Sequence, residues 1–270
     1  MSAVPRSPRC DALALCACIC IALAGCSHRG GAAATGGAGD DGQAESIGGV
    51  WNGTDASGQS FVGLADEAGE FHLIGDDGTQ YVGTAVTMGD AVAANAHRLV
   101  RPGRSGGSHY EPVSLKGTVQ QRVSLSLTLA PAAADRSFAP ETLSLQFNPI
   151  YDNPSSLTLF AGDYMDPASG NSITVTGSGS IFWRDSSNGC LADGSVSVID
   201  ARYDLYEVQF SYSACQGVDA GLNGVEFLGL GTLDTSLQPT QAIIGVSGEA
   251  GGRGYAIDLR LARLPPRSPV

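Results

Sequence analysis

Apolar and polar residues alternate with a period of two along much of this chain. Between residues 123 and 129, every odd position is Val or Leu and every even position is Ser or Thr. Similar alternation covers 206–212 and 255–261, and pairs such as Asn188-Gly189 punctuate the runs. This pattern predicts strands with one buried face and one wet face, as in antiparallel sheets. Asn-Gly tolerates the positive φ of tight hairpins, so the sequence indicates an all-β fold.

Eight strands are expected in each half of the chain, which suits a small up-and-down barrel. The expected fold class is therefore two tandem antiparallel eight-stranded β-barrel-like repeats, over 48–152 and 153–264. A pair of sandwiches or one larger continuous barrel is the alternative. The expected strands are 49–54, 58–66, 69–75, 79–88, 92–101, 110–119, 122–130 and 141–150, then 156–165, 171–177, 179–185, 189–199, 204–213, 224–234, 240–248 and 254–264.

The second half of the sequence echoes the first at a nearly constant offset. Ala-Ser-Gly at 56–58 recurs at 168–170, and the turn Asp77-Gly78 has its counterpart in Asn188-Gly189. Such regular spacing favours duplication of one barrel unit. Chance matching is the rival interpretation, because the chain contains 37 glycines.

The N-terminus has the layout of a secretory signal peptide, with Arg6 and Arg9 ahead of an apolar run over 12–24. Its ending at 23–26, Leu-Ala-Gly-Cys, resembles the lipobox of bacterial lipoproteins. The resemblance implies cleavage before Cys26, a thioether-linked diacylglycerol on its sulfur and acylation of its new amino group. The alternative is an ordinary secreted protein with an incidental cysteine.

Several acyl chains would hold the protein firmly on a membrane, whereas one holds it only marginally. In lipoproteins of Gram-negative bacteria, Asp after the lipidated cysteine favours inner-membrane retention, so Ser27 points to the outer membrane. The sequence thus predicts a signal peptide over 1–25 and a tether over 26–47. This Gly- and Ala-rich tether would reach roughly 25 Å. The last residues, 265–270, are expected to be a disordered tail.

Acidity restricts the partners of the mature protein. The whole chain has a net charge of −12, and the signal segment carries one net positive charge, so removing it leaves −13. Such a charge argues against nucleic-acid binding and against a polybasic lipid-binding face. The expected partners are the membrane through the N-terminal lipid, and an envelope protein or a small apolar ligand.

Two cysteines besides Cys26 remain after cleavage, in an oxidising compartment. Cys190 follows a turn and Cys215 ends a strand, so we expect them to join neighbouring strands of the second barrel by a disulfide. Closing a loop of this length is worth about 3 kcal/mol. No such bond is expected in the first half, where Thr79 occupies the position that matches Cys190.

The opening Gly49-Val50-Trp51 resembles the Gly-x-Trp start of lipocalin- and avidin-like barrels. The resemblance covers about 25 residues and implies a small β-barrel. It makes Trp51 a candidate ligand contact, although a plug for one end of the barrel core is the favoured interpretation. Eight-stranded barrels either fill with side chains or hold one small ligand.

No motif for catalysis, metal binding or cofactor binding is found. The chain has neither a Gly-x-Ser-x-Gly elbow nor a phosphate-binding glycine loop. His72, His97 and His109 are not spaced as zinc ligands, and His72 is expected to face solvent. We therefore expect a non-enzymatic envelope protein that acts by binding or interaction. A lipocalin-like carrier of a small apolar ligand is the alternative, and an envelope hydrolase is the third possibility.

Overall fold

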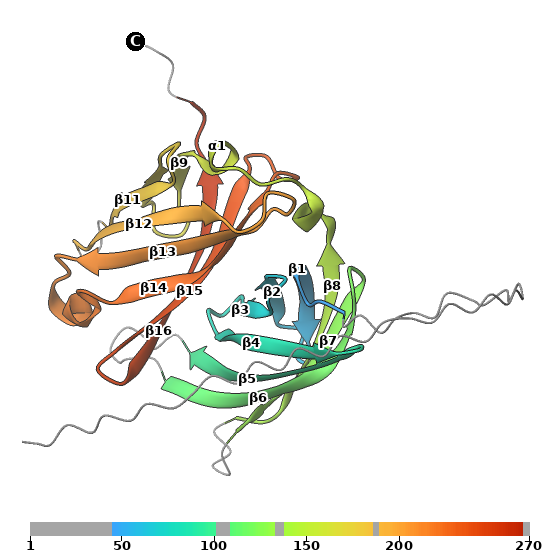
Figure 1. Ribbon diagram of the computed structural model, residues 1–270. Coiled ribbons are helices and arrows are strands. Elements are labelled where there is room, and N and C mark those ends of the chain that lie inside the picture. Colours follow the sequence, from blue (N-terminus) through green and yellow to red (C-terminus); the bar gives the residue numbers. More distant parts are fainter. Residues whose placement is uncertain (1–44, 101–108, 133–137, 186–188, 267–270) are drawn as a thin grey trace, which may run out of the picture. The chain divides into compact units, whose positions relative to one another are not determined.

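Two closed antiparallel β-barrels, each of eight strands, follow one another along the described chain, as the sequence predicts (Figure 1). The computed structural model describes residues 45–100, 109–132, 138–185 and 189–266. Cys26, the signal peptide and most of the tether lie outside the described residues. Neither a sandwich pair nor a single larger barrel is formed, because each set of strands closes on itself.

The first barrel is built from consecutive hairpins, so each strand pairs with its neighbours in sequence. Strand β8 closes the barrel against β1, with Phe147 opposite Trp51. The strands are β1 (Gly49–Asp55), β2 (Ser60–Ala65), β3 (Glu70–Gly75), β4 (Gln80–Met88), β5 (Ala91–Val100), β6 (His109–Gln120), β7 (Ser124–Pro131) and β8 (Glu141–Asn148).

The second barrel repeats this plan and closes where β16 pairs with β9, through Arg263 and Tyr164. The short helices η1 (Pro149–Asp152) and α1 (Leu157–Phe160) connect the barrels, and η2 (Gly217–Leu222) precedes β14. The strands are β9 (Gly162–Met165), β10 (Ser172–Val175), β11 (Ser180–Arg184), β12 (Leu191–Val198), β13 (Tyr206–Ser213), β14 (Glu226–Asp234), β15 (Gln241–Ala250) and β16 (Arg253–Arg263).

Two expected strands are wrong over part of their length. The strand expected over 141–150 ends at Asn148, because residues 149–152 form η1. The stretch 156–165 was expected to be extended, but α1 occupies 157–160 and only 162–165 is a strand. Ser156 caps the helix, since its Oγ accepts a hydrogen bond from the Leu159 N–H at 3.2 Å. The helix places Phe160, which is fully buried, against the Tyr206 ring at 4.6 Å. Local capping and core burial therefore outweigh the extended pattern here.

The sequence repeat corresponds to a repeat in backbone geometry. Gly69 and Gly179 both have a positive φ, of 92° and 86°. Each carbonyl accepts a hydrogen bond from a residue further along, Ala85 in the first barrel and Val196 in the second. A Cβ on either glycine would collide with the carbonyl oxygen of that same residue. Equivalent turns thus require glycine at equivalent positions, as duplication of one unit predicts.

Candidate functional site

Apolar side chains fill the first barrel around Trp51. The indole is fully buried, donates from Nε1 to the Ile47 carbonyl at 2.9 Å and packs edge-on against Phe147. A cavity of about 10 Å³ lies beside it, lined by side chains that include Phe71 and Leu115. This is roughly the space of one water, while pockets for drug-sized ligands exceed about 300 Å³. Trp51 therefore plugs the barrel in this packing.

Charged side chains gather at the other end of the first barrel. Arg98 has the same strand parity as the core residues Val92 and Ala96, so its side chain points inward. Its guanidinium lies 3.4 Å from a Glu111 carboxylate oxygen and 3.9 Å from one of Glu141.

Tyr81 joins this group from the barrel interior, where its side chain is fully buried. Its hydroxyl donates to Glu141 Oε2 at 2.5 Å and accepts from Arg98 Nε at 3.2 Å. Burial, followed by the Glu141 carboxylate, raises the pKa of Tyr81 above its ordinary value. The Phe138 ring lies 4.6 Å from the Arg98 guanidinium carbon. These contacts form a hydrogen-bonded polar layer at this end of the barrel. The alternation along β5 could have shown only that Arg98 points inward.

Aromatic and aliphatic side chains fill the second barrel. Trp183 packs edge-on against Phe210 with ring centroids 4.6 Å apart, and Phe210 stacks on Phe227 at 5.3 Å. All three side chains belong to one buried cluster with Cys190 and Cys215. The interior is thus a packed core.

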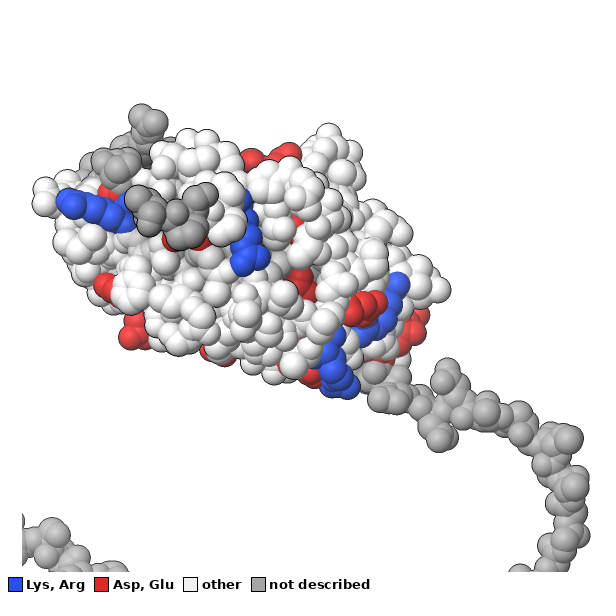
Figure 2. Space-filling view, turned by 90° about the horizontal axis from the view of Figure 1, so that it is seen from above, with Lys and Arg blue, Asp and Glu red and all other residues white. Residues whose placement is uncertain are grey.

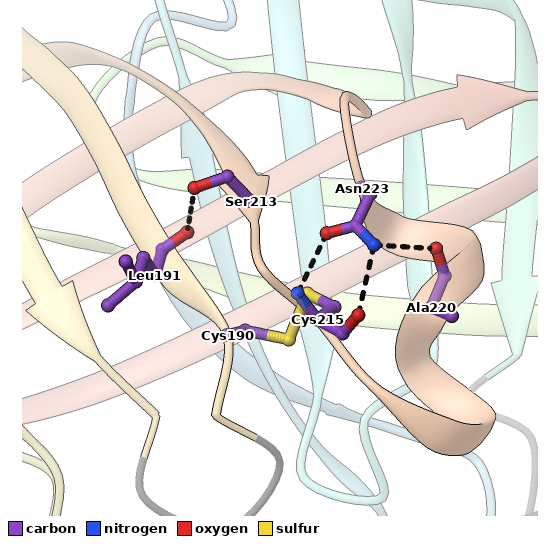
Figure 3. Close-up of a disulfide and its surroundings, with 6 residues drawn as sticks. All are labelled: Cys190, Leu191, Ser213, Cys215, Ala220 and Asn223. Carbon is purple, nitrogen blue, oxygen red and sulfur yellow. Dashed lines mark hydrogen bonds between the residues drawn. A yellow bond between two sulfur atoms is a disulfide. The ribbon is translucent and has the colours of Figure 1, made fainter.

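The predicted disulfide is confirmed. Cys190 and Cys215 are joined with their Cα atoms 4.1 Å apart, next to the paired residues Leu191 of β12 and Ser213 of β13 (Figure 3). Asn223 fixes the backbone of Cys215, because its side-chain amide accepts a hydrogen bond from the Cys215 N–H at 2.8 Å and donates one to the Cys215 carbonyl at 3.0 Å. The bond therefore fixes the register of two neighbouring strands.

The two barrels meet in a third buried cluster, called here the seam. It comprises Val50, Val62, Leu64, Ile74, Ile150, Tyr151, Leu205, Leu230 and Ile243. Glycines of the second barrel allow the approach, since a Cβ on Gly245 would lie 2.7 Å from the end of the Ile74 side chain. At the edge of the seam, Tyr151 stacks on Tyr203 with ring centroids 4.8 Å apart. The barrels are separate in strand pairing but share this core.

The expectation that His72 faces solvent is wrong. It does lie on the outer face of β3, but the second barrel covers that face and leaves the residue only 3% exposed. Burial lowers the pKa of His72 to about 4, against a smaller opposite effect of the neighbouring Gln80 side chain. Its Nδ1 has no hydrogen-bond partner among the described residues. Sequence parity gave the correct face of the strand, but it could not show that a second barrel covers it.

Neither His97 nor the turn at Asp77 forms part of a metal site in the described part of the chain. The His97 ring stacks on Tyr110 with centroids 3.9 Å apart, and the side chain of His109 lies outside the described residues. Asp77 accepts hydrogen bonds from the Thr79 N–H and hydroxyl, which makes its turn an ordinary side-chain-closed hairpin. Within the described part of the chain, no group of three potential metal ligands comes together.

The described chain begins at one end of the first barrel, called here the tether end. The Glu45 N–H donates to the Gly89 carbonyl at 3.2 Å, at the tip of the β4–β5 hairpin. The Glu45 carboxylate accepts from the Gln121 N–H at 2.8 Å, in the β6–β7 turn. Exposed apolar side chains occupy the same end: Val86 is 64% exposed and Met88 is 79% exposed. Sequence reasoning missed this surface, because the two hairpin tips come together only when the barrel closes.

Charged side chains are dispersed on one face of the molecule. Acidic and basic side chains are interspersed on the face seen in Figure 2, and most of that face carries neither. Among the described residues, there is also no helix with the length and apolar character needed to span a bilayer.

Comparison of this chain with protein-family models, curated proteins and solved structures gave no match. The resemblances to bacterial lipoproteins and to lipocalin- or avidin-like barrels therefore rest on the residues quoted above. The small β-barrel that the second resemblance implies is present in the structure.

Proposed function

We propose that this chain is a lipid-anchored protein of the bacterial cell envelope, on the outer membrane, that acts without catalysis as a binding or interaction module. The single observation that carries the mode of action is the filling of both barrels. The cavity beside Trp51 in the first barrel measures only about 10 Å³, and buried aromatic and aliphatic side chains pack together in the second. Binding would therefore take place on the outer surface.

The anchor is supported by the lipobox-like ending at Cys26 and by the hydrogen bonds that fix Glu45 at one end of the first barrel. Eighteen residues separate Cys26 from Glu45, which is fixed at one end of the first barrel. Such a segment suits a spacer between a lipid and a folded domain. Cys26 would carry the lipid, while Cys190 and Cys215 are already paired with each other.

Metabolic labelling with palmitate tests the anchor. The wild-type protein and the Ser27→Ala control should take up label and sediment with membranes. Cys26→Ala should lose both properties. Recovery of unlabelled wild-type protein in the soluble periplasmic fraction would refute the proposal.

A carrier of a small apolar ligand is the second candidate, favoured by the closed eight-stranded barrel and by Trp51 at one end of its core. To hold such a ligand, the barrel interior would need a cavity much larger than the present one. Extraction of the protein from cells, followed by mass spectrometry, decides between the two. A stoichiometric ligand would establish the carrier, whereas the interaction module predicts none.

A further inference from the structure

We infer that the tether end of the first barrel rests on the lipid surface to which Cys26 is anchored, with Val86, Met88 and Val123 in contact with that surface. This inference rests on the proposed lipid anchor and adds an orientation to it. It assigns the lipid bilayer itself, rather than another protein, as the partner of this surface.

The chain enters the first barrel at the tether end. Glu45 bridges two hairpin tips, by hydrogen bonds to Gly89 and Gln121. These tips are linked directly as well, since the Val119 N–H donates to the Asp90 carbonyl at 2.8 Å. The chain therefore leaves toward Cys26 from a defined end of the barrel. If the eighteen residues between Cys26 and Glu45 form a flexible tether, its reach of roughly 25 Å would keep this end near the anchor.

Exposed apolar side chains of the first barrel lie at the same end. Among the described residues of the first barrel, the large hydrophobic side chains left exposed are Val86, Met88 and Val123, with 64%, 79% and 48% exposure. All lie at or near the tips of the hairpins that Glu45 bridges. Val86 and Met88 are two positions apart on β4, so they share its outer face. Exposed apolar side chains that lie near one another at one end of the barrel suit an interaction surface.

Charge at this end indicates which lipid it would meet. Glu45 and Asp90 lie at the tips, whereas Arg122, beside Val123 in the β6–β7 turn, is paired with the carboxylates of Glu67 and Asp152. Acidic groups near the contact disfavour an anionic lipid surface. The surface therefore fits neutral, zwitterionic headgroups, into which a few apolar side chains can dip without spanning the bilayer.

Site-specific fluorescence on the full lipidated protein tests the orientation. A cysteine introduced by Met88→Cys would be the only free thiol, because Cys26 carries lipid and the other two cysteines are paired. It would be labelled with an environment-sensitive dye, and the protein would be reconstituted into phosphatidylcholine–phosphatidylethanolamine vesicles. Asp76→Cys, exposed on the β3–β4 turn at the opposite end of the same barrel, is the matched control.

The expected result is a blue-shifted emission at position 88 that is quenched by spin-labelled lipid, with neither effect at position 76. Replacing part of the neutral lipid by anionic lipid should weaken the shift. Vesicle-bound protein whose label at 88 stays water-exposed would overturn the orientation while leaving the anchor intact. A shift that follows protein concentration without lipid would assign the surface to a second copy instead. Protein that carries no lipid would overturn both proposals.

Discussion

At the scale of single residues, two buried ionisable groups make stability depend on pH in opposite directions. Burial lowers the pKa of His72 in the seam to about 4, and burial raises the pKa of Asp204 to about 7. Asp204 is 3% exposed and accepts hydrogen bonds from Thr232 and from the Leu233 N–H. Each residue therefore favours its neutral form in the folded protein.

His72 should make the protein sensitive to acid. Below about pH 6.5 the His72 imidazole takes up a proton in the unfolded chain. In the folded chain it stays neutral until the pH falls to about 4. The free energy of unfolding should fall across this window by up to about 3 kcal/mol. Urea unfolding of His72→Leu should show a flatter pH dependence there, whereas His97→Gln on β5 should keep the wild-type slope. Equal slopes in wild type and His72→Leu would contradict the burial of a neutral imidazole.

Asp204 should have the opposite effect. Its raised pKa stabilises the fold fully below about pH 3.8, and this contribution is lost as pH rises toward about 7. Asp204→Asn should therefore be more stable than wild type at pH 8, by up to about 4 kcal/mol, and close to it at pH 4. Thermal unfolding at both pH values measures this, with Asp193→Asn on the exposed face of β12 as control. An equal effect at both pH values would mean that ionisation is not the cause.

At the scale of elements, the sequence predicted the strands because burial in these barrels follows the period of two. Inward positions of β7, such as Leu125 and Leu127, are 3% exposed. The short α1 helix was missed, since a single capped turn at Ser156 leaves no helical period to detect. The inward charges at the mouth of the first barrel lie on predicted strands, but their meeting depends on barrel closure.

Disulfide removal should affect the two barrels differently. Cys190→Ala with Cys215→Ala should destabilise the second barrel by about 3 kcal/mol, because the unfolded chain regains the freedom of the opened loop. Single-tryptophan variants separate the responses: Trp183→Phe leaves Trp51 to report the first barrel, and Trp51→Phe leaves Trp183 to report the second. The transition reported by Trp51 should change little. An equal loss of stability in the transitions reported by Trp51 and by Trp183 would mean that the seam couples the unfolding of the two barrels completely.

A larger residue in place of Gly245 would test how closely β15 approaches β3. A Cβ there would lie 2.7 Å from Ile74 Cδ1 and 3.3 Å from His72 Cβ, so Gly245→Val should push against the seam. Overpacking of this kind costs roughly 1–3 kcal/mol. Gly177→Val is the matched control, because a Cβ there meets nothing within 4 Å. Chemical denaturation that shows equal stability for both variants would contradict the seam.

At the scale of the whole molecule, the sequence predicted two barrels but not their shared core. Leu64 and Ile74 alternate as outward residues, and alternation alone assigns such positions to solvent. Covering them requires a second surface, and the matching glycines of that surface lie more than 150 residues away in the chain. The tether end was likewise missed, because its apolar side chains come together only when separate hairpins close into a barrel.

Native mass spectrometry of the protein extracted from membranes in mild detergent tests the central claim most directly. It should give the mass of residues 26–270 plus a diacylglyceryl group and an N-acyl chain, with one disulfide and no further bound molecule. A mass without lipid would contradict the anchor. A lipidated chain that carries a stoichiometric small molecule would contradict an interaction module with filled barrels.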